Sequence, residues 1–189
     1  WFNTGSLCNI TCKNCFMDSS PTNNQIAYLS LAEVKSYLAE IELESLRVEE
    51  IAFTGGEPFM NQDIIDMMDI SLQKGYRVLV LTNAMKPLLN KRHLLSPLLK
   101  KFSSNLILRV SIDHFTQILH EVVRGKDTWK PMIEGIRWLS EAGANITVAG
   151  RTCWKETESD LRKGYENLFA TERISVNADD PTALVLFPE

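Results

Sequence analysis

The chain has 189 residues, of which 44% are hydrophobic and 23% charged, and its formal net charge is -4. This size and balance predict a globular domain with a substantial core, and the mild acidity argues against nucleic acid as a partner, because phosphate binding needs a basic surface. No apolar run is long enough to span a bilayer and no secretory signal begins the chain, so we expect a cytoplasmic protein without a membrane anchor.

Both ends of the chain read as cuts through a longer polypeptide. The sequence begins at Trp1 and stops on the apolar segment 183–189 without a polar tail. We therefore expect residues 1–189 to form one core domain of a longer protein, cut near its C-terminus.

Short apolar runs alternate with amphipathic stretches along the chain. A sixth strand falls at either 174–176 or 183–187, and the sequence does not decide between them. The other five apolar runs predict strands at residues 2–7, 51–53, 76–81, 106–112 and 145–150.

The helices between these strands have recognisable ends. Ser30 and Glu33 form a capping-box pattern at the start of the first one. Pro87 suits the first turn of the third, and Pro97 predicts a break or kink in it. We expect the remaining helices at residues 63–74, from 114 to a break near 124–125, over 128–142 and over 158–170.

Near-continuous apolar strands that alternate with helices predict a parallel sheet covered by helices, either open and doubly wound or curved into a barrel. In both folds the loops after the carboxyl ends of the strands carry the chemistry. The unusual residues of this chain lie in those loops, at positions 8–15, 55–58, 82–83, 111–113 and 151.

Three of the four cysteines share one loop. Cys8, Cys12 and Cys15 are too close in sequence for a sensible disulfide framework, but thiolates on one loop can hold one corner of an iron–sulfur cube. A cubane has four irons, so one would stay open to a cofactor or substrate. The alternatives are a zinc-binding module with Cys153 as fourth ligand, and an electron-transfer iron–sulfur module, which normally uses four cysteines.

Residues 55–58 read Gly-Gly-Glu-Pro and close the second predicted strand. The two glycines have no side chains to block a close ligand, and Glu57 offers a carboxylate suited to an ammonium group. The alternative is a plain tight turn with a surface glutamate.

Together, and in this order, the cysteine loop and the Gly-Gly-Glu sequence resemble the signature of the radical S-adenosylmethionine (SAM) superfamily. The resemblance implies that Cys8, Cys12 and Cys15 bind a [4Fe–4S] cluster. It also implies that the amino and carboxylate groups of SAM chelate the fourth iron.

By the same resemblance, Gly55, Gly56 and Glu57 contact the methionine moiety of SAM, with Glu57 on its amino group. One position departs from the family pattern. Members usually carry an aromatic residue just before the third cysteine, near the SAM adenine, whereas this chain has Asn14 there and Phe16 after the cysteine.

The resemblance extends through Ser111, Asp113 and the Arg124-Gly125 pair to about residue 170, where the chain is similar to peptide-modifying members and to the molybdenum-cofactor cyclase. It implies a partial (β/α)6 barrel of parallel strands with outer helices. It also implies that the reduced cluster cleaves SAM, and that the resulting 5′-deoxyadenosyl radical abstracts hydrogen from a peptide or small-molecule substrate. An electron donor such as flavodoxin or ferredoxin is then a further expected partner.

Other polar residues at the strand ends are candidates for SAM binding. Ser111 and Asp113 could bind its ribose or carboxylate, although Asp113 could equally cap the next helix. Thr82 and Asn83 could line the SAM site or simply form a strand-to-helix turn. Arg151 could pair with the SAM carboxylate or form a surface ion pair.

The remaining polar side chains give weaker signals. Cys153 could be a radical relay, an extra ligand or a small core residue, of which the last is the commonest role of a free cysteine. The three histidines have no metal-ligand spacing, so we expect surface or packing roles for them.

Overall fold

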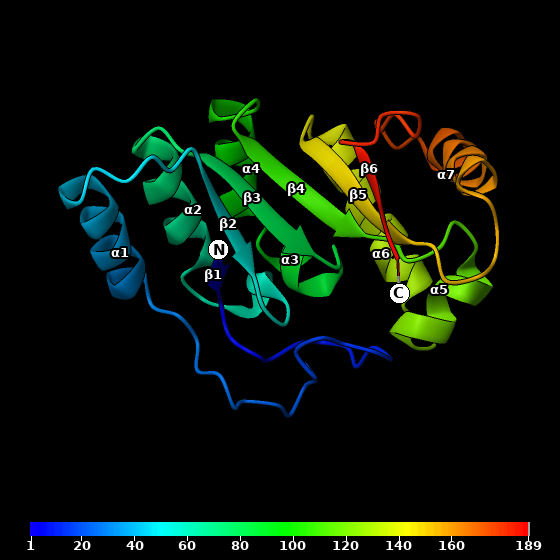
Figure 1. The fold of residues 1–189 in the computed structure, drawn as a ribbon, viewed down its shortest axis with the longest axis horizontal. Coiled ribbons are helices and arrows are strands. Elements are labelled where there is room, and N and C mark those ends of the chain that lie inside the picture. Colours follow the sequence, from blue (N-terminus) through cyan, green and yellow to red (C-terminus); the bar gives the residue numbers. More distant parts are fainter. Residues whose placement is uncertain (189) are drawn as a thin grey trace.

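Six parallel strands form one sheet whose spatial order follows the chain, β1-β2-β3-β4-β5-β6 (Figure 1). The computed structural model describes residues 1–188. Because the order never reverses, the sheet curves as part of a barrel, whereas a doubly wound sheet has a reversal point. The strands are β1 (Phe2–Asn3), β2 (Glu50–Thr54), β3 (Arg77–Thr82), β4 (Leu106–Ser111), β5 (Asn145–Arg151) and β6 (Leu184–Phe187).

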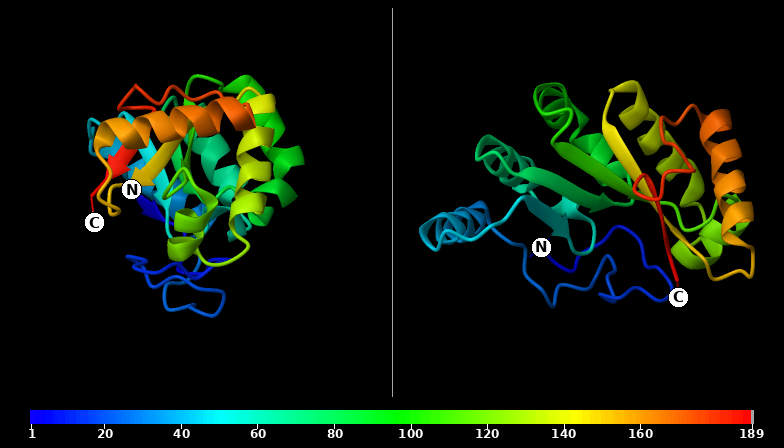
Figure 2. Two further views of the ribbon diagram at one scale, coloured as in Figure 1. Left: turned by 90° about the vertical axis from the view of Figure 1, so that its right-hand side faces the viewer. Right: turned by 45° about the horizontal axis from the view of Figure 1, so that its top comes forward.

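Helices cover the outer face of this sheet (Figure 2). None of those in the described chain has the length and apolar character needed to cross a membrane. The arrangement confirms the expected partial (β/α)6 barrel. The helical elements are α1 (Leu31–Leu43), the 3-10 turn η1 (Pro58–Met60), α2 (Ile64–Gln73), α3 (Lys86–Asn90), α4 (Arg92–Lys101), α5 (Gln117–Arg124), α6 (Trp129–Glu141) and α7 (Glu158–Glu172).

Local sequence signals account for several of these boundaries. The capping box at α1 is confirmed, because the Ser30 hydroxyl accepts from the Glu33 amide at 3.2 Å and the Glu33 carboxylate accepts from the Ser30 amide at 2.8 Å. Of the two predicted positions for the sixth strand, 174–176 and 183–187, the second is correct, because β6 spans Leu184–Phe187. The predicted helix break near Pro97 is wrong. The helix is interrupted at Lys91, between α3 and α4, and Pro97 lies inside α4.

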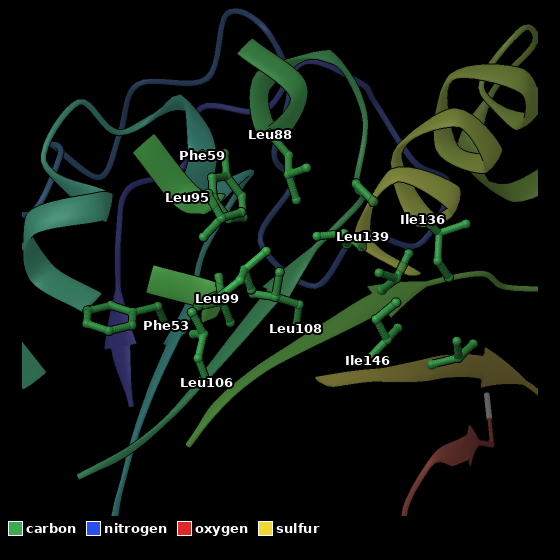
Figure 3. Packing of buried hydrophobic residues seen from close by; sticks show 14 of the residues in the cluster. Phe53, Phe59, Leu88, Leu95, Leu99, Leu106, Leu108, Ile136, Leu139 and Ile146 are labelled. Atoms are coloured by element: carbon green, nitrogen blue, oxygen red, sulfur yellow. The ribbon is translucent and has the colours of Figure 1, made fainter. Parts of the chain in front are cut away.

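The core lies between the sheet and its helices (Figure 3). Along β4 every second side chain is buried, including Leu106, Leu108 and Val110. The side chains between them are half-buried on the other face, where Arg109 donates to the Thr147 hydroxyl at 3.1 Å. The inner face of the partial barrel therefore keeps polar side chains while the outer face forms the core.

The first strand is shorter than residues 2–7, because the chain leaves the sheet to pack against the end of β2. The amide of Gly56 donates to the Gly5 carbonyl at 2.8 Å, and the amide of Glu57 donates to the Leu7 carbonyl at 3.0 Å. A Cβ at Gly55 would lie 2.6 Å from the Gly5 oxygen, and one at Gly56 would overlap the Leu7 carbonyl. Both glycines are thus needed for the cysteine loop to dock on the sheet.

The substitution Gly56→Ala tests this packing. We expect it to destabilise the protein by about 1–3 kcal/mol, because overpacking forces backbone shifts. We also expect faster proteolytic cleavage within residues 5–29, since the loop loses its contact with β2. Limited proteolysis with mass spectrometry and chemical denaturation measure both effects.

Gly143→Ala is the matched control, because its added Cβ meets nothing within 4 Å. It should cost about 1–2 kcal/mol for its left-handed backbone and leave the cleavage of residues 5–29 unchanged. Equal cleavage of that segment in both variants would contradict the packing role of Gly56.

Candidate functional site

A cavity of about 460 Å³ opens at the carboxyl ends of the strands, where the segment between β1 and α1 passes below the sheet (Figure 1). Its volume is in the range of small-molecule sites. Every residue that the sequence singled out as a cofactor or metal ligand lines it, except Asp113 and Cys153. These residues are Cys8, Cys12, Cys15, Gly55, Gly56, Glu57, Thr82, Asn83, Ser111 and Arg151.

The cysteine loop is held to the rest of the fold by main-chain hydrogen bonds. The Cys8 amide donates to the Ser20 carbonyl at 3.1 Å, and the Lys13 amide donates to the Val123 carbonyl in α5 at 2.8 Å. Cys8 is buried, whereas Cys12 and Cys15 are half-buried. The loop therefore presents all three thiols to one cavity while its other side faces solvent.

The Cys8 and Cys12 thiols hold their protons more tightly than free cysteine does. Burial raises the pKa of Cys8 to about 12 and also raises the pKa of Cys12, and in both cases the Arg124 guanidinium partly offsets the effect. A metal group that binds here must therefore displace protons, as is usual for thiolate ligands.

The donor set fits an iron–sulfur cluster better than a single ion. Within residues 1–188, no three Cys, His, Asp or Glu side chains are grouped so as to hold one metal ion. In a cubane each thiolate binds a different iron, so three cysteines need only line a common cavity, as they do here. In addition, the buried Ser19 hydroxyl beside them has no hydrogen-bond partner in the described chain.

Glu57 is buried at the centre of the cavity wall. Its Oε1 accepts from the Thr82 hydroxyl at 2.8 Å and from the Phe59 amide at 3.2 Å, and its Oε2 accepts from the Asn83 amide at 2.8 Å. Burial outweighs these bonds and raises the pKa of Glu57 to about 7. A carboxylate has roughly four acceptor positions, so about one is left for a ligand.

Asn83 connects this carboxylate to the cysteine loop. Its side-chain nitrogen donates to the side-chain oxygen Oδ1 of Asn9 at 2.9 Å and lies 3.8 Å from the Cys8 sulfur. Its side-chain oxygen accepts from the Met85 amide at 3.0 Å, which shapes the turn into α3. Both predictions for Asn83 are therefore correct, because it stabilises the strand-to-helix turn and also lines the cavity.

Asp113 does not line the cavity and does not cap α5, whose N-cap is Thr116. It is buried behind the cavity wall, where it accepts from Arg124 at 2.7 and 3.1 Å and from Arg151 at 3.3 Å. Burial alone would raise the pKa of Asp113, but Arg124 and then Arg151 outweigh it and hold the pKa below its usual value. Asp113 therefore positions two guanidinium groups that line the cavity.

Arg124 is one site residue that sequence reasoning missed, and Ser19 is another. Arg124 appeared there only as part of the Arg-Gly pair that ends a helix, and Gly125 does end α5. Its partner lies eleven residues earlier in the chain, after another element, so no periodic pattern links the two. The one signal that the sequence offered was an arginine at the predicted end of a helix, directly before Gly125.

The other predicted polar residues lie outside the cavity. His114 and His120 are both buried packing residues: His114 contacts Glu156 at 3.2 Å, and His120 packs edge-on against Trp129. Cys153 is half-buried and does not line the cavity within the described chain. Within the described chain, Cys153 therefore belongs neither to the buried core, where it was expected, nor to the lining of this cavity.

Known proteins with similar sequences cover parts of this chain. It is 29% identical over 143 residues to the antilisterial bacteriocin subtilosin biosynthesis protein AlbA of Bacillus subtilis (strain 168), which is 75% of this chain and 30% of that protein. It is 28% identical over 106 residues to an S-adenosylmethionine-dependent nucleotide dehydratase of Selenomonas ruminantium, which is 56% of this chain and 35% of that protein. The chain spans about a third of the length of these curated relatives.

Solved structures share the fold at low sequence identity. SuiB of Streptococcus suis bound to S-adenosylmethionine superposes with a TM-score of 0.69 at 15% identity, over 91% of this chain and 37% of SuiB. The protein anSMEcpe with bound AdoMet superposes with a TM-score of 0.64 at 16% identity, over 98% of this chain and 49% of its own.

The family model of the radical SAM superfamily matches residues 2–168, which include every cavity residue described above. Enzymes of this family use a [4Fe–4S] cluster and SAM, and both suit a cavity that combines three thiols with a buried carboxylate and two guanidinium groups. The match spans most of the chain and agrees with the fold, so this chain belongs to the radical SAM superfamily.

Proposed function

We propose that this chain is the core domain, residues 1–189, of an enzyme that uses SAM radical chemistry to modify a peptide. The observation that carries the proposal is the single cavity that joins the cysteine loop to residues 55–57 and to the ends of β3, β4 and β5. In this proposal Cys8, Cys12 and Cys15 bind three irons of a [4Fe–4S] cluster, and the fourth iron is left for SAM.

The relatives favour a peptide as the substrate. AlbA, a bacteriocin biosynthesis protein, matches the longer stretch of this chain, and SuiB has been crystallised with its precursor peptide SuiA. The nucleotide dehydratase relative makes a nucleotide the competing substrate. An electron donor such as flavodoxin or ferredoxin belongs to the proposal as well, because the cluster must be reduced.

The chemistry that the bound cofactors supply is one-electron cleavage of SAM to a 5′-deoxyadenosyl radical, which abstracts hydrogen from the substrate. The chain's own residues bind and orient. Glu57 accepts a hydrogen bond from the SAM amino group at its remaining acceptor position. Arg151 and Ser111, which line the same cavity, bind the SAM carboxylate or ribose.

The buried groups around the cavity keep these contacts rigid. Asp113 holds the guanidinium groups of Arg124 and Arg151, and Thr82 fixes the Glu57 carboxylate. Groups that are already in place need no rearrangement when a charged ligand binds. Arg124 also places a positive charge near the thiolates of the cysteine loop, which lowers the cost of their ionisation.

The first test is cluster assembly under anaerobic conditions with iron and sulfide. We expect about four irons per protein, an EPR signal of the reduced cluster that changes with SAM, and release of 5′-deoxyadenosine after dithionite is added. Replacing any one of Cys8, Cys12 and Cys15 by Ala should abolish the product, whereas Cys153→Ala should not. A colourless protein with one bound zinc would contradict the proposal.

The substrate is tested with the same preparation. Deuterium transfer from a labelled candidate precursor peptide into 5′-deoxyadenosine supports peptide modification. Transfer from a nucleoside triphosphate, with none from the peptide, would contradict the peptide proposal and indicate a nucleotide substrate.

Glu57→Gln tests the contact with the SAM amino group. Loss of a charge-assisted hydrogen bond should weaken SAM binding by about 1.5–3 kcal/mol, roughly 10- to 100-fold. The raised pKa, about 7, means that Glu57 is mostly neutral at pH 6 and mostly ionised at pH 8. The variant should therefore lose more affinity at pH 8 than at pH 6.

Isothermal titration of the cluster-loaded protein with SAM at both pH values measures this difference. Glu158→Gln is a suitable control, because Glu158 forms an exposed pair with Arg162 on α7, away from the cavity. An equal loss of affinity at the two pH values would mean that the charge of Glu57 plays no part in binding.

A further inference from the structure

The Ser19 hydroxyl is a buried polar group that the proposed SAM contacts do not use. Ser19 is 2% exposed and lines the cavity, yet its Oγ has no hydrogen-bond partner in the described chain. Leaving a buried hydroxyl unsatisfied is destabilising, because the group has lost its hydrogen bonds to water and gained none in return. Its burial at this position therefore indicates a partner that the protein chain does not supply.

The main chain around Ser19 is attached to two of the three cysteines. The Ser19 amide donates to the Cys15 sulfur at 3.4 Å. The next carbonyl, that of Ser20, accepts from the Cys8 amide at 3.1 Å, and Ser20 forms a parallel bridge with Leu7. The main chain of residues 19–20 is therefore tied to the Cys15 sulfur on one side and to the Cys8 backbone on the other, which keeps Ser19 beside the cysteine loop.

The hydroxyl of the neighbouring residue, Ser20, differs from that of Ser19 because it has hydrogen-bond partners in the chain. The Ser20 side chain accepts from the amides of Thr22 and Asn23, at 3.3 and 3.0 Å, and so stabilises the turn that follows. Its hydrogen bonds are made within the loop. Ser20 thus needs no ligand, whereas Ser19, one residue earlier, does.

We infer that the Ser19 hydroxyl donates a hydrogen bond to a sulfur of the bound cluster, either a cysteine thiolate or a bridging sulfide, and thereby raises the cluster's reduction potential. The inference rests on the proposed cluster site. Hydrogen bonds to the sulfurs are among the factors that set the potential of such clusters. The reduced cluster carries one more negative charge than the oxidised one, so a donor stabilises it more strongly.

The reaction concerned is the uptake of one electron by the cluster from an external reductant, with no bond made or broken. Because SAM cleavage needs the reduced cluster, Ser19 would act by setting the fraction of reduced protein at a given reductant strength. It would do so from outside the iron ligands, as a residue that tunes the cofactor.

The test is a redox titration of the cluster-loaded protein without SAM, followed by EPR with dithionite as reductant. Ser19→Ala should make the cluster harder to reduce by a factor of three to ten in the equilibrium constant, where tenfold corresponds to about 59 mV for one electron. Ser19→Thr, which keeps the hydroxyl, and Ser20→Ala should both stay within a factor of two of the wild type. A Ser19→Ala potential equal to that of the wild type, with an intact [4Fe–4S] signal, would overturn the inference.

Three further outcomes separate this inference from the proposed function. If Ser19→Ala and Ser19→Gly fail to assemble a cluster while Ser19→Thr and Ser20→Ala succeed, the hydroxyl is required at the cluster, which supports the contact. If Ser19→Thr is shifted as far as Ser19→Ala, the hydroxyl is not responsible and the inference fails. If the wild type itself binds no [4Fe–4S] cluster, the proposed function fails, and this inference with it.

Discussion

The close backbone contact between residues 5–7 and residues 55–57 sets the geometry of the site. Two amide-to-carbonyl hydrogen bonds join these segments, and any side chain at Gly56 would overlap the Leu7 carbonyl. The cysteine loop is otherwise an irregular segment without helix or strand of its own. Because this loop docks on the end of β2, its three thiols lie in the same cavity as the carboxylate of Glu57, which is far from them in the sequence.

Charge balance is the second requirement of this cavity. Glu57 and Asp113 are buried carboxylates close to thiols, and each has its charge compensated by a different route. Glu57 relies on hydrogen bonds from neutral donors, and burial still raises its pKa to about 7, whereas Asp113 is held ionised by Arg124 and Arg151. The first group is therefore able to respond to a cationic ligand, while the second is structural.

Much of the fold could be predicted because its signals are local. Apolar runs marked the positions of the first five strands, and the capping box at Ser30 marked the start of α1. The sixth strand could not be chosen, because both candidates are short apolar runs and only pairing with β5 distinguishes them. The first strand was predicted too long, since the path of residues 4–7 is decided by contact with Gly55 and Gly56 rather than by their own apolar character.

The site could be predicted in part for the same reason. The residues at the ends of parallel strands must meet at one edge of a sheet, and they do so here. Their partners could not be predicted: the ion pair of Asp113 with Arg124, and the bonds from Thr82 and Asn83 to Glu57, join different elements. The two glycines were expected to make room for a ligand, and nothing in the sequence indicated that a Cβ at either position would also collide with residues 3–7.

The central claim is that three cysteines bind a cubane cluster and leave one iron for SAM. Mössbauer spectroscopy of protein loaded with iron-57 tests it most directly, because the method resolves individual iron sites. We predict that adding SAM changes the signal of one iron in four and leaves the other three unaltered. Four irons that stay equivalent with saturating SAM, or a cluster that needs Cys153 as a fourth ligand, would contradict the account.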